Sequence, residues 1–111
     1  MRDFTWSDGE KKLARGVFEG ALQAELAEVM ADFKSRAAAA MTPDGVWELE
    51  GYLRGKRTGI DRKYDYRYSQ LISVFAQLLR EERVREAQLA GFSEEKLAAI
   101  RLMAGIEEPR R

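Results

Sequence analysis

Residues 7–45 read SDGEKKLARGVFEGALQAELAEVMADFKSRAAAAMTPDG, which describes a long helix followed by a stop signal. Ser7 and Glu10 have the S-x-x-E spacing of a capping box, in which each side chain accepts a hydrogen bond from the backbone N–H of the other residue. Apolar residues then recur at spacings of four and three, which places on one helical face Phe18, Leu22, Leu26, Val29 and Phe33. The pattern predicts a first helix over residues 7–41, about 50 Å long at about 1.5 Å per residue.

A second helical segment, expected over residues 44–90, follows the turn. Pro43 suits its first position, where the missing N–H needs no partner. Three glycines spaced four apart interrupt the helix formers, and each costs about 1 kcal/mol relative to alanine inside a helix. We therefore expect a break or kink near residues 55–60, with Asp61 close to the new cap. The alternative is a continuous helix in which another backbone approaches a face lined by Gly51, Gly55 and Gly59.

The C-terminal part predicts one more boundary and a short last helix over residues 93–104. Gly91 is placed to end the preceding stretch in a left-handed conformation, and Ser93 is placed to cap the last helix. No stretch alternates between apolar and polar residues as a strand would. The prediction is one all-α domain over residues 1–111, an elongated helical hairpin with a small helical head. Because such a hairpin cannot cover its own apolar faces, we expect a homodimer.

Composition excludes several classes of function. The 111 residues are 45% hydrophobic and 34% charged, which is typical neither of a disordered chain nor of a membrane protein. The longest uncharged stretch, residues 68–79, is shorter than the roughly 20 residues of a membrane span. The N-terminal residues lack the apolar run of a secretory signal, so we expect a cytoplasmic protein without membrane insertion. The absence of Cys and His removes thiolate nucleophiles, imidazole bases and the usual transition-metal sites.

The remaining chemistry consists of carboxylates, cations and aromatic rings. Nineteen basic and nineteen acidic residues cancel, which argues against a general nucleic-acid binder. Basic and tyrosine side chains alternate between residues 52 and 68; we interpret them as a solvated face, with protein binding and single-stranded nucleic-acid binding as alternatives. Neighbouring glutamates, such as Glu81 and Glu82, diverge on a helix, so we expect no enzyme and no metal site.

Trp6 is expected to pack against the first turn, and Trp47 to lie in the core or, as the alternative, to anchor an interface.

Three segments in the middle of the chain carry a resemblance. Residues 47–57 read W-x-L-x-x-x-L-x-x-K-R, residues 60–67 read I-D-x-K-Y-D-x-R, and residues 74–79 read V-F-A-Q-L-L. In this order and without gaps, they resemble the fluorescence recovery protein family of cyanobacteria. The resemblance implies an all-helical homodimer that binds the photoactivated orange carotenoid protein and speeds its return to the resting form, which ends quenching at the phycobilisome. It implies no cofactor and no covalent chemistry, because preferential binding of one conformation is enough to shift an equilibrium.

The resemblance also implies where the binding surface lies. A family patch near the dimer interface contains a Trp and an Arg that match Trp47 and Arg57. The sequence departs from the family at Glu50-Gly51, where His-Asp is typical, and at Ser73, where an aromatic residue is typical. We expect Glu50 or Glu48 to supply the carboxylate partner of Arg57, either across the two-fold axis of the dimer or through a chain bend at Gly55 or Gly59, because Glu50 lies seven residues before Arg57. We retain a dimeric helical adaptor for another protein as the alternative function. The predicted partner-binding or dimer-interface residues are Trp47, Glu50, Leu53, Arg57, Asp61, Lys63, Tyr64 and Phe75.

Overall fold

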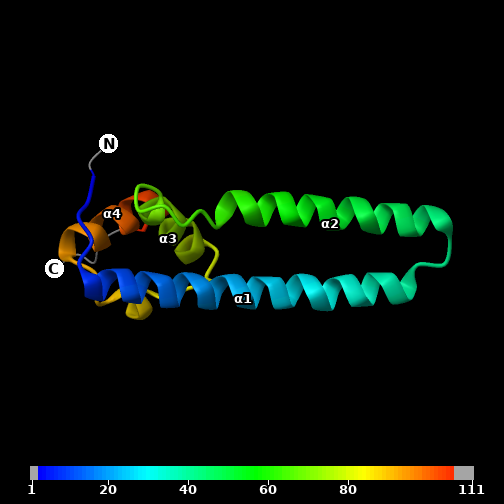
Figure 1. The fold of residues 1–111 in the computed structure, drawn as a ribbon, viewed down its shortest axis with the longest axis horizontal. Coiled ribbons are helices and arrows are strands. Elements are labelled where there is room, and N and C mark those ends of the chain that lie inside the picture. Colours follow the sequence, from blue (N-terminus) through cyan, green and yellow to red (C-terminus); the bar gives the residue numbers. More distant parts are fainter. Residues whose placement is uncertain (1–2, 107–111) are drawn as a thin grey trace. The chain divides into compact units, whose positions relative to one another are not determined.

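The computed structural model describes residues 3–106, and all of its regular structure is helical (Figure 1). The helices are α1 (Asp8–Ala39), α2 (Pro43–Lys63), α3 (Leu71–Arg80), the 3-10 helix η1 (Glu86–Leu89) and α4 (Glu94–Ala104). The all-α prediction is confirmed for these residues. The chain divides into two compact units, which we call the head unit (Met1–Ala21 with Asp65–Arg111) and the hairpin unit (Leu22–Tyr64).

Local capping signals place three of the helix starts. Ser7 and Glu10 form the predicted capping box, with both reciprocal hydrogen bonds at 3.1 Å. Thr42 accepts a hydrogen bond from the Gly45 N–H at 3.1 Å, directly before Pro43 at the first position of α2. Ser93 accepts the Lys96 N–H at 3.3 Å at the start of α4. These boundaries are predictable because both partners of each cap lie within three residues.

The predicted break near residues 55–60 is wrong, because α2 continues through that region to Lys63. Ion pairs of i,i+4 spacing, Glu50 with Arg54 and Arg57 with Asp61, support the helix around the glycines. A Cβ added at any of the three glycines would meet no described atom within 4 Å. The expected single segment over 44–90 instead ends after α2, and an irregular stretch precedes α3.

The left-handed residue that follows α3 is Glu82, with φ of 59°, and not Gly91 as predicted. The Glu82 N–H donates to the Leu79 carbonyl and the Arg83 N–H donates to the Leu78 carbonyl, the two bonds of a Schellman motif. Gly91 has a different role, because a Cβ at this position would lie 2.9 Å from Cδ2 of Leu13. Any larger residue at this position would make the end of the Leu13 side chain shift, so close packing favours glycine here and backbone conformation does not.

Replacing Glu82 with glycine is expected to raise the free energy of unfolding by about 0.5–1 kcal/mol, because glycine adopts positive φ without the steric penalty of a Cβ. Urea denaturation of the variant and the parent protein measures the difference. The control is Gly105→Ala, which places a Cβ at φ of 74° at the end of α4 and should lower stability. If Glu82→Gly instead lowered the free energy of unfolding, the steric penalty inferred for glutamate at positive φ would be contradicted.

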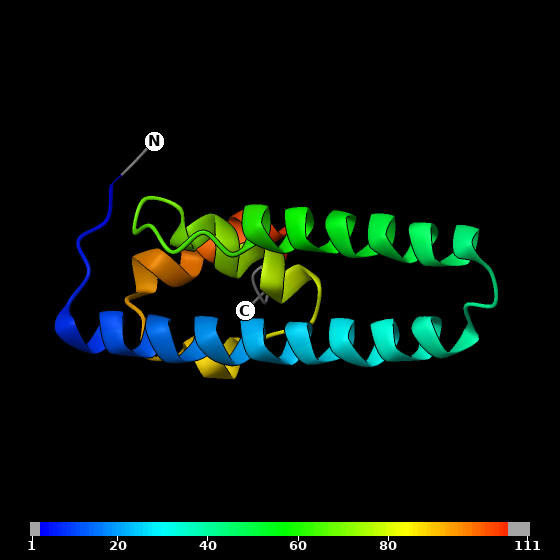
Figure 2. The same cartoon turned by 45° about the vertical axis from the view of Figure 1, so that its right-hand side comes forward.

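The head unit has a continuous apolar core. Its fully buried large side chains are Leu71, Phe75, Leu78, Leu89 and Ile100. Figure 1 and Figure 2 both show α3 beside α4. Trp6 is buried and lies edge-on to the ring of Phe92, with centroids 5.5 Å apart, and 5.8 Å from the ring of Tyr68. Trp6 therefore packs on residues more than sixty positions away, which the predicted local packing did not include.

Candidate functional site

In the hairpin unit, the second half of α1 and α2 run antiparallel (Figure 1). Near the C-terminal end of α2, the Glu25 carboxylate lies 2.6 Å from Nζ of Lys63 and accepts a hydrogen bond from the Tyr64 hydroxyl at 2.8 Å. The side chains of Lys63 and Glu25 are only 10% and 15% exposed. Both Lys63 and Tyr64 were predicted as binding residues, and the structure uses them to join the two helices.

A second polar contact joins the helices farther along the hairpin. Asp32 accepts hydrogen bonds from the Tyr52 hydroxyl and from the Arg36 guanidinium. The guanidinium also lies 4.1 Å from the centre of the Tyr52 ring. The hydrogen bond from Tyr52 lowers the pKa of Asp32, and the same bond raises the pKa of Tyr52. These contacts fix which side of α2 faces α1, and the opposite side of α2 faces outward.

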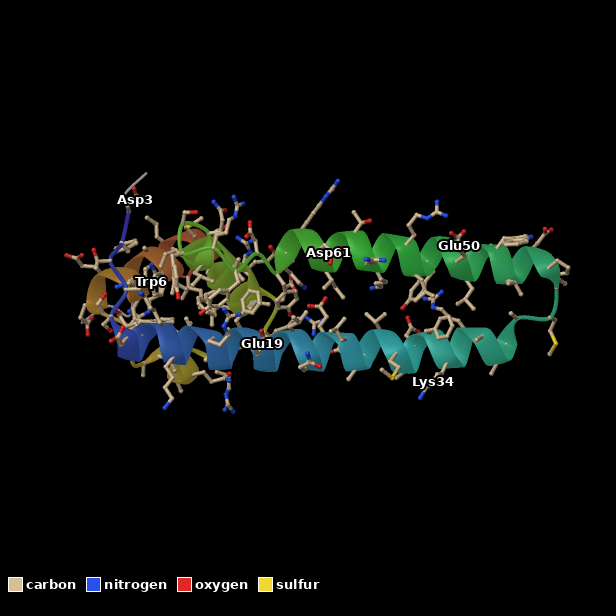
Figure 3. The ribbon with its side chains drawn as sticks, viewed as in Figure 1. Asp3, Trp6, Glu19, Lys34, Glu50 and Asp61 are labelled. Carbon is tan, nitrogen blue, oxygen red and sulfur yellow. The ribbon has the colours of Figure 1, made fainter. Side chains whose placement is uncertain are left out.

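That outward side is the candidate binding surface, which we call the outer face of α2. At about 100° per residue, one side of the helix gathers the exposed residues Trp47, Glu50, Gly51, Arg54, Arg57, Thr58 and Asp61. Figure 3 shows Glu50 on the side of α2 that is turned away from α1. The surface combines a tryptophan ring with two arginines, and both residue types are enriched in protein interfaces.

The charged part of the outer face shows the partner of Arg57 within one chain, whereas the contact predicted across the two-fold axis stays a prediction. Its side chain is 86% exposed and its Nε lies 3.8 Å from the Asp61 carboxylate, four residues away. Glu50 pairs with Arg54 instead. Within the chain, the partner of Arg57 is therefore Asp61 and not Glu50 or Glu48. Exposed pairs of this kind contribute little to folding, so the guanidinium is accessible to a partner at small cost.

The apolar part of the outer face lies near the turn between α1 and α2. Trp47 is 68% exposed, which overturns its expected place in the core and agrees with the interface alternative. Met41 and Val46 are also exposed beside it in the sequence, whereas Leu53 is half-buried. Exposed large apolar side chains that are grouped together are typical of interaction sites.

Phe75 does not belong to this surface. It is fully buried in the head unit, where its ring centre lies 5.5 Å from that of Phe92. Its inclusion among the predicted binding residues is corrected to a role in the core. The V-F-A-Q-L-L motif lies within α3, where six of ten residues are buried, so the motif specifies packing.

Sequence reasoning missed Glu25, which contacts both Lys63 and Tyr64. Its position was a usable signal, because a carboxylate between Leu22 and Leu26 on the first helix lies close to the apolar face and needs a partner when buried. Among residues 3–106, no three acidic side chains are grouped so that they could hold a metal ion. No helix within the same range has the length and apolar character needed to cross a bilayer.

Substituting Glu25 with glutamine is expected to lower the free energy of unfolding by about 2–3 kcal/mol, because the largely buried Lys63 loses the carboxylate that lies 2.6 Å from its Nζ. Urea denaturation of the variant measures the loss. The matched control is Glu48→Gln, which changes an exposed glutamate of α2 and should alter stability by less than about 0.5 kcal/mol. Equal losses in the two variants would contradict the importance of the Glu25 contacts.

Similarity to known proteins extends over almost the whole chain. A family model described as photoprotection regulator fluorescence recovery protein matches residues 6–104. The fluorescence recovery protein of Synechocystis sp. is 37% identical over 99 residues, which cover 89% of this chain and 91% of that protein.

Solved structures of such proteins are similar over a comparable length. The Fremyella diplosiphon fluorescence recovery protein superposes with a TM-score of 0.86 at 32% identity, over 92% of this chain and 100% of that chain. The structure of the fluorescence recovery protein from Synechocystis sp PCC 6803 also superposes with a TM-score of 0.86, at 36% identity, over 92% of this chain and 100% of that chain. The resemblance based on residues 47–57, 60–67 and 74–79 is confirmed.

Proposed function

Because the chain belongs to the fluorescence recovery protein family of photoprotection regulators, we propose that it binds the photoactivated orange carotenoid protein and accelerates its return to the resting form. This action ends photoprotective quenching. It requires no covalent step, because a protein that binds the transition state or the product-like conformation better than the active form speeds and favours the change. We propose accordingly that it acts without enzymatic activity and without a cofactor.

The observation that carries this proposal is the composition of the outer face of α2. Trp47 and Arg57, the two residues matched to the functional patch by resemblance, are both exposed on this helix. Trp and Arg are the residue types that most often dominate binding energy in protein interfaces. The outer face of α2 therefore offers an aromatic anchor and an accessible guanidinium to a protein surface.

We further propose that two copies of the chain form a homodimer through the hairpin unit. The large apolar side chains of Met30, Val46 and Trp47 are exposed and all belong to the hairpin unit, so a second copy of the chain could cover them. Sedimentation equilibrium at micromolar concentration should give twice the mass of the 12.7 kDa chain. The mass of a single chain at this concentration would refute the homodimer.

The function is tested by mixing the purified protein with photoactivated orange carotenoid protein in the dark and timing the red-to-orange change by absorbance. We expect the recovery rate to rise with the concentration of the protein until it saturates. Bovine serum albumin at equal mass concentration is the control for nonspecific effects. An unchanged recovery rate at a tenfold molar excess would refute the proposal.

The second candidate is a dimeric helical adaptor for another protein, favoured by Glu50-Gly51 where the family typically has His-Asp. Glu50 is engaged by Arg54, so the charge pattern presented by this face differs from the typical one. If the chain is such an adaptor, it should form a stable dimer and leave the recovery rate of the carotenoid protein unchanged. Acceleration of recovery would exclude it as the principal function.

A further inference from the structure

The outer face of α2 carries four charged side chains in a row, which we call the charge stripe: Glu50, Arg54, Arg57 and Asp61. Their spacings of four, three and four place them within about 60° of one another around the helix, at about 100° per residue. Figure 3 labels the two acids at the ends of the stripe. Along α2 the order is acid, base, base, acid, and it is the same in both directions.

Within the chain, each arginine of the charge stripe is paired with the acid at its own end. Arg54 pairs with Glu50, and Nε of Arg57 lies 3.8 Å from the Asp61 carboxylate. The two arginine side chains are 73% and 86% exposed, so water reaches both guanidiniums. Because exposed pairs contribute little free energy, a carboxylate of another protein can join or replace either acid at small cost.

The order of the charges argues against two other occupants. If two copies of the chain met symmetrically about the middle of the stripe, Glu50 would face Asp61 of the other copy and the arginines would face each other, so that like charges repel. The proposed homodimer rests on apolar side chains outside the stripe. Nucleic acid is also disfavoured, because the acids at both ends repel phosphates and the four charges cancel. The stripe complements a protein surface with the order base, acid, acid, base.

We propose that the charge stripe binds a protein surface on which two neighbouring carboxylates are flanked by basic side chains. Arg54 is then a second binding arginine beside Arg57, and both guanidiniums donate hydrogen bonds to the carboxylates, a match that their planar array of donors favours. Glu50 and Asp61 determine specificity, because they repel a surface that is acidic throughout. The inference rests on the proposed function for the identity of the partner, and it adds the charge pattern that this partner must carry.

The first test needs no carotenoid protein. Three alanine-based peptides of about 17 residues, long enough to form a helix, carry four side chains at the spacings of the stripe: Lys-Glu-Glu-Lys, the reversed Glu-Lys-Lys-Glu, or four glutamines. Each is titrated to millimolar concentration into the full-length protein while proton–nitrogen spectra of the arginine Nε–H groups are recorded. We expect Lys-Glu-Glu-Lys to shift Arg54 and Arg57 saturably and to bind about fivefold more tightly than the glutamine peptide. Equal shifts with all three peptides, or none with Lys-Glu-Glu-Lys, would overturn the proposal.

Variants separate the roles of the bases and the acids. Arg54→Gln should abolish the preference for Lys-Glu-Glu-Lys, whereas Arg62→Gln, which alters an exposed arginine of α2 outside the stripe, should not. The double variant Glu50→Gln/Asp61→Asn should bind an oligothymidylate of about 20 nucleotides at least about tenfold more tightly than the parent at low salt. Circular dichroism confirms that each variant folds. Unchanged binding of the oligonucleotide would refute the role of the acids.

The second test uses the recovery assay of the proposed function. Arg54→Gln should raise the protein concentration that gives half-maximal acceleration by about fivefold, and Arg62→Gln should leave it unchanged. If the parent protein does not accelerate recovery, the proposed function fails, and the peptide titration still decides whether the stripe selects the charge pattern. If the parent accelerates recovery and Arg54→Gln does so at the same concentration, Arg54 does not bind this partner and the proposal is overturned.

Discussion

Replacement of Lys96 with methionine is expected to lower the free energy of unfolding by about 3–5 kcal/mol, the usual cost of removing one partner of a buried ion pair. Lys96 is 4% exposed and Glu10 is 9% exposed, so neither charge can recover its hydration in the folded protein. Methionine preserves most of the volume of the lysine stem. The loss therefore measures the charge and its hydrogen bonds more than the packing.

The large expected loss in the free energy of unfolding follows from the number of segments that the Lys96–Glu10 pair joins. The Lys96 ammonium lies 3.1 Å from Oε1 of Glu10 and donates to the Thr5 carbonyl at 2.8 Å. The carboxylate of Glu10 accepts the N–H groups of Ser7 at 3.1 Å and Ser93 at 2.9 Å. One buried cluster thus connects the N-terminal segment, the start of α1 and the start of α4.

A double-mutant cycle tests the pair. Urea denaturation at neutral pH gives the stability of Lys96→Met, Glu10→Gln and the double variant, and the double variant should lose less than the sum of the two single losses. Lys34→Met is the matched control, because Lys34 lies on α1 and is exposed (Figure 3). If Lys96→Met costs no more than Lys34→Met, or if the two losses add, the pair does not stabilise the head unit as argued.

The same cluster gives stability a defined pH dependence. Burial raises the pKa of Glu10, but the hydrogen bonds from the Ser7 and Ser93 N–H groups and from Lys96 outweigh burial and hold the pKa at about 2, against an ordinary value of 4.5. Because the folded value is the lower one, this stabilisation is present above pH 4.5 and declines as the pH falls toward 2. Glu10→Gln should lack this part of the acid-induced loss, which unfolding measured between these pH values will show.

The sequence predicts structure well where the cause is local and poorly where the cause is tertiary. The Ser7–Glu10 box and the Ser93 cap involve residues three apart, and each was predictable from spacing alone. The burial of Trp6 against Phe92 has no local signal. Likewise, Glu82 adopts positive φ because the chain must turn after α3, although glutamate has no preference for this conformation.

The outer face of α2 shows the same difference between local and tertiary causes. Helical spacing alone places Trp47, Glu50 and Arg57 on one side of α2 once the helix is continuous. The glycine penalties argued against that continuity, yet α2 runs through all three glycines to Lys63. The burial of Phe75 and the pairing of Lys63 with Glu25 depend on which elements meet, and a single sequence does not state this.

Replacement of Trp47 with alanine is expected to slow the recovery of the orange carotenoid protein about thirtyfold at concentrations of the protein below saturation, which corresponds to about 2 kcal/mol for an aromatic hot spot. The indole is 68% exposed, so its removal should leave folding stability nearly unchanged. The recovery rate is measured by absorbance over a range of protein concentrations, with Lys34→Ala as a control on another exposed side of the hairpin unit.

Trp47→Phe separates the role of an aromatic ring from that of apolar area, and it should restore much of the rate lost in Trp47→Ala. Sedimentation equilibrium on the same variants separates dimerisation from partner binding. If Trp47 acts only by holding the dimer, raising the concentration of Trp47→Ala until it is dimeric will restore the full rate. If Trp47 contacts the partner, the dimeric variant will remain slow. A Trp47→Ala protein with normal dimerisation and normal recovery would remove the outer face of α2 from both roles, and the proposed function would then have to rest on another surface of the chain.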